Sequence, residues 1–170
     1  MKIVVLACCL TSGCYVSADV ASIEQTLAAQ SFTGAGVSHA GSIMTETKDL
    51  NLNLGKSVLR VLTELDLTRI TFSPASGISK IDFISELTLT AQGTTGVTPL
   101  PDAVIARFAA GMPIAANGGI DAEVMRVDVV PYLQQGLPFR LTVTAFAPSA
   151  DWSLGIDIVL HAESDGKIDP

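Results

Sequence analysis

The sequence predicts an all-β protein, a single antiparallel β-sandwich of about seven or eight strands with one or two short helices. Runs of alternating apolar and polar residues recur along the chain, and Gly/Pro-rich turns separate them without a βαβ rhythm. Only 16% of the residues are charged, whereas surface helices are normally rich in Lys and Glu. Aromatic residues make up 5% of the chain, which favours a sandwich over a lipid-binding barrel with an aromatic-lined cavity.

About the first quarter of the chain is expected to precede this sandwich. Residues 20–32 are predicted to form a short helix, because Val20, Ile23 and Leu27 fall on one helical face. Residues 31–37 are predicted to be irregular or a weak strand. The sequence therefore divides into a leader (1–13), a tether (14–41), a β-sandwich domain (42–164) and a polar tail (165–170).

The first half of the predicted sandwich mixes two periodicities. Leu50, Leu52 and Leu54 alternate with asparagines, which indicates a half-buried strand. Apolar residues between 58 and 65 recur every three or four positions, so a short helix or helical turn is expected there. Residues 68–73 return to strand chemistry and are followed by a turn at 74–77.

The second half alternates more regularly. Strands are predicted at 86–90, 104–109, 124–130, 139–145 and 152–160, and a loop at 93–101. A helical turn is expected from Pro131, because the residue before a proline disfavours α conformation. Residues 147–151 are predicted to join the last two strands as a hairpin-like loop. Residues 72–76 resemble 146–150; either both segments are related hairpins or two β-turns resemble each other by chance.

The charge pattern excludes one class of partner. The net charge is −7, and the basic residues are spread singly along the chain. Nucleic-acid-binding proteins carry a basic stripe that neutralises phosphates, so we expect no nucleic-acid partner. A polybasic patch for anionic lipid headgroups is also missing.

The start of the chain has the order of an export signal. Lys2 is the only charge before Asp19, residues 3–10 are apolar, and Ser12-Gly13 lead to Cys14. The apolar run is too short to span a bilayer, which takes about 20 residues. Both other cysteines, Cys8 and Cys9, lie inside this leader, so the body offers no thiol for a disulfide or a thiolate metal site.

This N-terminal pattern resembles the signal peptide of a bacterial lipoprotein. The resemblance covers about the first 15 residues and implies cleavage before Cys14, which would become the lipid-modified first residue. It departs from the family pattern at Thr11, where leucine is usual; here Leu10 stands one place earlier. The absence of Asp at position 15 favours the outer membrane. The body, residues 42–164, has the general pattern of small β-sandwich lipoproteins of unassigned role.

A second cleavage site competes with the first. Cleavage after Ala18, preceded by Val16-Ser17, satisfies the small-residue rule and would release a soluble protein, periplasmic or secreted, that begins at Asp19. An uncleaved apolar N-terminus is the third alternative.

The body contains few groups suited to catalysis or metal binding. The two histidines of the chain, His39 and His161, are expected in a solvated loop and at a strand end, and no metal-ligand spacing such as HExxH occurs. A serine hydrolase would need a base and an orienting acid, and no G-x-S-x-G elbow is present. We expect no metal, no cofactor and no catalytic residue.

Carboxylates are the remaining reactive groups. Asp82 and Asp157 each interrupt an apolar strand and are expected on the solvent face; turn capping and an oxygen-ligand Ca²⁺ site are the alternatives. Asp151 beside Trp152 could serve sugar binding, but a turn residue next to a core ring is the ordinary interpretation.

The sequence therefore predicts a non-enzymatic lipoprotein, anchored to the outer membrane through Cys14 and acting as a structural or binding module for an unidentified protein or polysaccharide. The alternative is an exported carbohydrate- or polymer-binding domain that stacks sugars on Trp152 and Tyr132. A hydrolase with two facing carboxyl groups is the third hypothesis.

Overall fold

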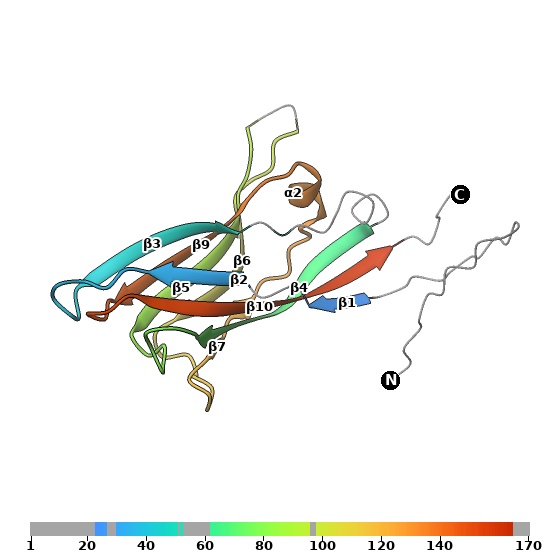
Figure 1. The fold of residues 1–170 in the computed structure, drawn as a ribbon. Helices are drawn as coiled ribbons and strands as arrows, with labels where there is room; N and C mark the ends of the chain where they lie inside the picture. Colours follow the sequence, from blue (N-terminus) through green and yellow to red (C-terminus); the bar gives the residue numbers. More distant parts are fainter. Residues whose placement is uncertain (1–22, 27–29, 51, 53–61, 96–97, 165–170) are drawn as a thin grey trace, which may run out of the picture.

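The computed structural model describes residues 23–26, 30–50, 52, 62–95 and 98–164. These residues form two antiparallel sheets packed against each other, with one short helix (Figure 1), so the predicted all-β sandwich is confirmed. The ten strands in the described part exceed the predicted seven or eight: the strands at 23–26 and 120–121 were not expected, and the strand at 30–34 overlaps the segment predicted to be irregular or a weak strand.

The first sheet is centred on a long pair, β4 and β10. One edge of β10 holds both β1 and β2, one after the other, while β4 lies along its other edge and β7 completes the sheet. Its strands are β1 (Ile23–Thr26), β2 (Gln30–Gly34), β4 (Leu62–Pro74), β7 (Ile120–Asp121) and β10 (Trp152–Ser164).

The second sheet has the strand order β3-β9-β5-β6-β8. The helix α2 (Val130–Gln134) lies in the connection from β8 to β9, with Pro131 in its first turn as the sequence predicts. The strands are β3 (Ile43–Leu50), β5 (Ile84–Ala91), β6 (Ala103–Ala109), β8 (Glu123–Val124) and β9 (Phe139–Phe146).

The core between the sheets is apolar. Along β9 and β10 every second side chain points inward, as the period of a strand requires, and no polar or charged residue among those described is fully buried. The inward side chains of these two strands are Phe139, Leu141, Val143, Ala145, Trp152, Leu154, Ile156, Ile158, Leu160 and Ala162.

A β-bulge interrupts the same alternation in β4. Val159 pairs with Arg69 and Leu160 pairs with Leu67, so Thr68 is an extra residue on β4. Its hydroxyl donates to the Val159 carbonyl at 3.2 Å. The bulge lets both Leu67 and Ile70 face the core although they are three residues apart.

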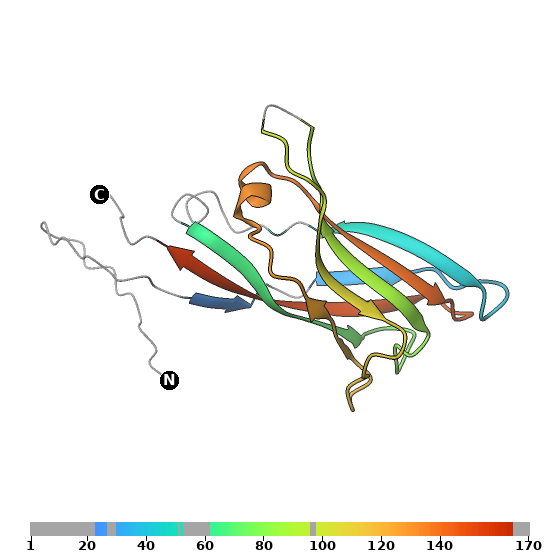
Figure 2. The same ribbon diagram turned by 180° about the vertical axis from the view of Figure 1, so that it is seen from behind.

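The two open sides of the sandwich are closed differently. On one side, residues 120–129 pass from the first sheet (β7) to the second (β8) and return to the first, where the Val129 amide donates to the Leu65 carbonyl at 2.9 Å. On the other side, Lys48 Nζ of β3 donates to the Ser31 carbonyl of β2 at 2.7 Å. Figure 2 shows this chain path from behind, with α2 above it.

Two expectations about the N-terminal region are wrong. Residues 23–26 and 30–34 are strands paired with β10, not parts of a helix spanning 20–32. The 14–41 segment is therefore not all tether, since the sandwich begins at Ile23. The hydrogen-bonding edge of the long strand β10 outweighs the helical spacing of Val20, Ile23 and Leu27.

Three further expectations need correction. The predicted helical turn lies largely outside the described residues, and its last apolar positions, Leu62 and Leu65, belong to β4. Of the alternating residues 50–54, only Leu50 belongs to a strand, β3, which begins earlier, at Ile43; Leu52 lies outside the strand, and positions 51, 53 and 54 are outside the described residues. Of residues 124–130, only Val124 belongs to a strand and Val130 begins α2; the segment between them crosses from one sheet to the other.

The loop at 147–151 is not a hairpin. It links β9 in the second sheet to β10 in the first, and the connection from β4 to β5 also crosses between the sheets. Each of the two similar segments, 72–76 and 146–150, therefore includes the end of a strand and the start of a connection between the sheets. In the described part of the chain, no helix has the length and apolar character needed to cross a membrane.

Candidate functional site

The predicted lipidation residue, Cys14, lies outside the described residues. Eight residues, Tyr15 to Ser22, separate it from the start of β1. Fully extended, eight residues reach at most about 29 Å. Ile23 pairs with Ala162 near the end of β10, so the chain from Cys14 enters the sandwich at the end where β10 finishes (Figure 1).

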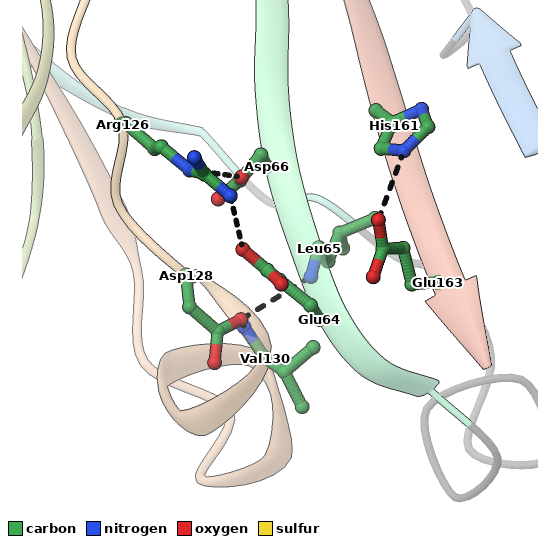
Figure 3. A network of polar contacts seen from close by, with 8 residues as sticks. All are labelled: Glu64, Leu65, Asp66, Arg126, Asp128, Val130, His161 and Glu163. Carbon is green, nitrogen blue, oxygen red and sulfur yellow. Dashed lines mark hydrogen bonds and ion pairs between the residues drawn. The ribbon is translucent and has the colours of Figure 1, made fainter. Parts of the chain in front are cut away.

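A group of charged side chains, which we call the acidic cluster, lies on the outer face of the first sheet at this same end. On β4, Glu64 and Asp66 point away from the core, between the inward Leu65 and Leu67. In the β4–β10 ladder, Asp66 lies opposite His161 and Glu64 lies opposite Glu163. Figure 3 shows the cluster, whose members are Glu64, Asp66, Arg126, Asp128, His161 and Glu163.

Arg126 forms ion pairs with two carboxylates in this cluster. Arg126 Nη2 lies 3.4 Å from Glu64 Oε1, and Arg126 Nε lies 3.5 Å from Asp66 Oδ2. Both distances exceed the 2.7–2.9 Å of a strong charge-assisted hydrogen bond. The Arg126 side chain is 84% exposed, so these ion pairs are loose and screened by water.

Asp66 is the most enclosed carboxylate of the cluster. Its side chain is 14% exposed, and its buried Oδ1 atom has no hydrogen-bond partner among the described residues. Burial raises the pKa of Asp66 above its usual value, and the neighbouring Glu64 raises it further, whereas Arg126 acts in the opposite direction. Asp66 therefore takes up a proton more readily than an exposed aspartate.

Asp128 fastens the segment after β8 to the edge of β4. Its Oδ1 accepts hydrogen bonds from the Leu65 amide at 3.2 Å and from the Val130 amide at 3.0 Å. The second bond satisfies an amide at the start of α2, as a capping side chain does. Asp128 thus joins three parts of the structure: β4, the crossing segment and the helix.

The aromatic residues considered for sugar binding are both buried. Trp152 is 2% exposed and packs against Phe32 and Phe83, with ring centroids 5.7 and 5.1 Å apart. Tyr132 is 5% exposed and donates its hydroxyl to the Pro101 carbonyl at 2.8 Å; burial raises its pKa. Neither ring offers a surface on which a sugar could stack.

Two surface hollows of about 520 Å³ each lie away from the acidic cluster. The first is formed by residues 93–95 and 100–102, between β5 and β6. The second lies beside β2 and is lined by Glu46, Asp151 and part of Trp152. Asp151 Oδ1 accepts a hydrogen bond from the Gly36 amide at 2.8 Å, so this aspartate fastens the loop after β2 to the loop before β10.

Of the other polar residues singled out in the sequence, only His161 belongs to the acidic cluster. Asp82 is exposed in the turn before β5, and Asp157 is exposed on the outer face of β10, as expected for solvated positions. His39 lies in an exposed loop with Ser38 Oγ 3.2 Å from its Nδ1 atom. His161 lies on β10 with its Nε2 atom 3.5 Å from Glu163.

The acidic cluster is what the sequence analysis missed. The Glu-x-Asp spacing of Glu64 and Asp66 on the outer face of a strand was the available signal, but the predicted helical turn obscured it. Within the described part of the chain, no group of three or more His, Cys, Asp or Glu side chains is placed to hold a metal ion. The paired carboxylates of Glu64 and Asp66 lie under Arg126 on a sheet face, and neither hollow contains them.

Comparison with known proteins adds no relative: no family model matches the chain, and a search of the curated proteins found no match.

Proposed function

We propose that the protein is a lipoprotein anchored to the outer membrane through Cys14, whose β-sandwich acts as a non-enzymatic structural or binding module of the cell envelope. The observation that carries this proposal is the N-terminal order of Lys2, an apolar run, Ser12-Gly13 and Cys14. An acyl anchor supplies about 0.8 kcal/mol per buried CH₂, and two or more chains give stable attachment.

The position of the first strand supports this arrangement. Because only eight residues separate Cys14 from β1, the sandwich would stand close to the membrane, with the acidic cluster at its near end. β10 has 13 residues, and at about 3.3 Å per residue it spans about 40 Å. The loops at the start of β10 would therefore face away from the membrane and be available to a partner.

No second function is favoured by a specific observation. The carbohydrate-binding alternative depended on stacking against Trp152 and Tyr132, and both rings are buried. The hydrolase hypothesis required two carboxyl groups facing each other in a cleft, and the pair formed by Glu64 and Asp66 lies on a sheet face under Arg126.

The intact mass of the N-terminal fragment tests the proposal. The protein is expressed with its own leader and recovered from membranes, and we expect a fragment that begins at Cys14 and carries acyl groups. Cys14→Ser should abolish the acylated fragment and release the protein from membranes, whereas Cys9→Ser, inside the leader, should leave both unchanged. An unmodified fragment that begins at Asp19 would refute the proposal.

A further inference from the structure

The strand β3 leaves one side of its main chain unpaired in the part of the chain that the structure describes. It stands at the end of the order β3-β9-β5-β6-β8, so only β9 bonds to it (Figure 1). β3 has eight residues, whereas β8, at the other edge of this sheet, has two. An unpaired strand edge is a template for pairing with another chain, so β3 is the long edge at which this sheet can be extended.

Two main-chain bonds show which residues of β3 face the open edge. The Ala147 amide donates to the Ser42 carbonyl at 3.0 Å, and the Gln92 amide donates to the Pro138 carbonyl at 3.0 Å. Residues of a strand bond alternately to the neighbour on one side and on the other. Both bonds therefore set the even-numbered residues of β3 toward β9. The odd-numbered residues direct their amides and carbonyls outward: Ile43, Thr45, Thr47 and Asp49.

Two charged side chains lie on the inward side of β3, at the open side of the sandwich. Glu46 Oε1 lies 3.4 Å from the Ala35 amide nitrogen, and Lys48 Nζ donates to the Ser31 carbonyl at 2.7 Å. Neither side chain forms an ion pair within the described residues. Charges on an edge strand normally deter a pairing strand, because the new neighbour would leave them without a partner. A suitable neighbour would have to supply the opposite charges.

A second copy of β3 supplies them in one register. In antiparallel pairing, outward-facing residues must lie opposite outward-facing residues, so a two-fold pair is centred on a residue of β3. Centred on Thr47, the pair places Glu46 opposite Lys48 of the second copy, and Lys48 opposite its Glu46. Centred one residue earlier or later, Glu46 faces Glu46 or Lys48 faces Lys48. Parallel pairing in register would repeat both like-charge contacts.

We propose that the chain forms a two-fold dimer in which two copies of β3 pair antiparallel about Thr47, so that two five-stranded sheets become one continuous sheet. Glu46 and Lys48 then meet at positions that are not hydrogen-bonded, where facing side chains come closest. Opposite charges that face each other stabilise a strand pair, and like charges destabilise it. On the same side, Met44 faces Leu50 of the second copy and adds an apolar contact.

The antiparallel pairing also fixes how the two copies are oriented. It reverses the long axis of one sandwich relative to the other, so the two chains enter at opposite ends of the dimer, each at its own Ile23. Two copies that stand upright on one membrane could not pair in this way, whereas copies on facing surfaces or in detergent could. The dimer is therefore a property of the sandwich itself and does not rest on the proposed anchor.

Sedimentation equilibrium of the full chain in density-matched detergent tests the dimer. We expect a reversible monomer–dimer equilibrium, with no larger species, because a two-fold contact uses the open edge of both copies and closes the assembly. A chain that stays monomeric up to about 1 mM would overturn the proposal.

Two charge reversals and their mixture test the register. Glu46→Lys makes both charged contacts Lys–Lys, and Lys48→Glu makes both Glu–Glu, so each variant alone should dimerise at least about tenfold more weakly. Mixing the two variants restores opposite charges at both contacts and should give a heterodimer of about wild-type affinity. If the mixture associates as weakly as the single variants, Glu46 does not face Lys48 and the proposed register is wrong.

Thr47→Pro tests the edge without changing a charge. The Thr47 amide faces the open edge, so its loss leaves the ladder to β9 intact, and circular dichroism should match that of the wild type. The dimer should be lost. Asp157→Lys makes the same kind of charge reversal on the exposed face of β10 and should retain the dimer. A dimer that survives Thr47→Pro would use another surface and overturn the proposal, while the proposed anchor at Cys14 would be unaffected.

Discussion

The contact between Gly34 and Trp152 provides the sharpest prediction from the fold. Gly34 of β2 pairs with Trp152 of β10, and the indole ring lies directly over the glycine. A Cβ atom at position 34 would lie 2.6 Å from the indole nitrogen and closer still to two ring carbons, so the ring would have to move. Phe32 and Phe83 pack against the ring and limit that movement. Overpacking of this kind typically costs 1–3 kcal/mol, and we expect Gly34→Ala to cost about 2–3 kcal/mol.

Urea unfolding of the full chain in detergent measures this cost. Trp152 is the only tryptophan in the sequence, so its fluorescence reports on the altered contact itself. A loss of about 2–3 kcal/mol corresponds to an unfolding equilibrium constant raised about 30- to 150-fold. The midpoint should fall by about 1–2 M urea for an m-value in the usual range, and the emission of the folded state should shift as the ring is displaced.

Gly41→Ala is the matched control. Gly41 has a φ of 87°, and a methyl group added there would meet no other atom within 4 Å, so only its left-handed backbone opposes the change, by about 1 kcal/mol. Its folded-state emission should equal that of the wild type. If Gly34→Ala retains both the midpoint and the emission of the wild type, the ring does not lie against Gly34 and the reasoning is refuted.

Further substitutions test other contacts. Phe72→Ala should cost about 3–5 kcal/mol in urea unfolding followed by circular dichroism, because the ring is fully buried; a loss below about 1 kcal/mol would contradict its place in the core. Tyr132→Phe should cost about 1 kcal/mol in the same assay, since it removes the hydroxyl bond to Pro101; an unchanged midpoint would argue against that bond. Asp128→Ala should lower the thermal midpoint more than Asp49→Ala, because Asp128 accepts two main-chain amides whereas Asp49 makes an exposed ion pair; the reverse order would contradict the bracing role of Asp128.

The strands that the sequence predicted well are those whose burial matches the period of a strand. Residues 139–145 alternate strictly and 152–160 do so except at Val159, and both runs lie in strands with one face in the core. The helical turn at Pro131 was also predictable, because proline restricts its own and the preceding backbone conformation. Both features, the alternation and the effect of proline, depend only on neighbouring residues, so they can be recognised in a single sequence.

The errors arise where distant segments decide the structure. A second register shift leaves Thr63 as an extra residue on β4, so Leu62 and Leu65 both pack on the core although they are three positions apart, and this spacing imitates a helix. Residues 23–26 become a strand because β10, more than 120 residues later, offers them an edge. The spacing of apolar residues within a short segment carries no information about a pairing strand so far along the sequence.

The acidic cluster could be predicted only in part. The outward positions of Glu64 and Asp66 follow once β4 is recognised as a strand. Their approach to Arg126, about 60 residues away, depends on the path by which the chain crosses between the sheets. No motif in the sequence encodes that path.

The end-to-end arrangement of β1 and β2 along one edge of β10 has a mechanical consequence. In the anchored arrangement that we propose, a pull between the membrane and a partner at the far loops would act along β1, parallel to the strands and at right angles to the hydrogen bonds that join β1 to β10. Such a load shears the bonds together, whereas a pull across the sheet would unzip them one at a time. The direction in which the chain enters the sandwich therefore suits it to withstand tension along its long axis.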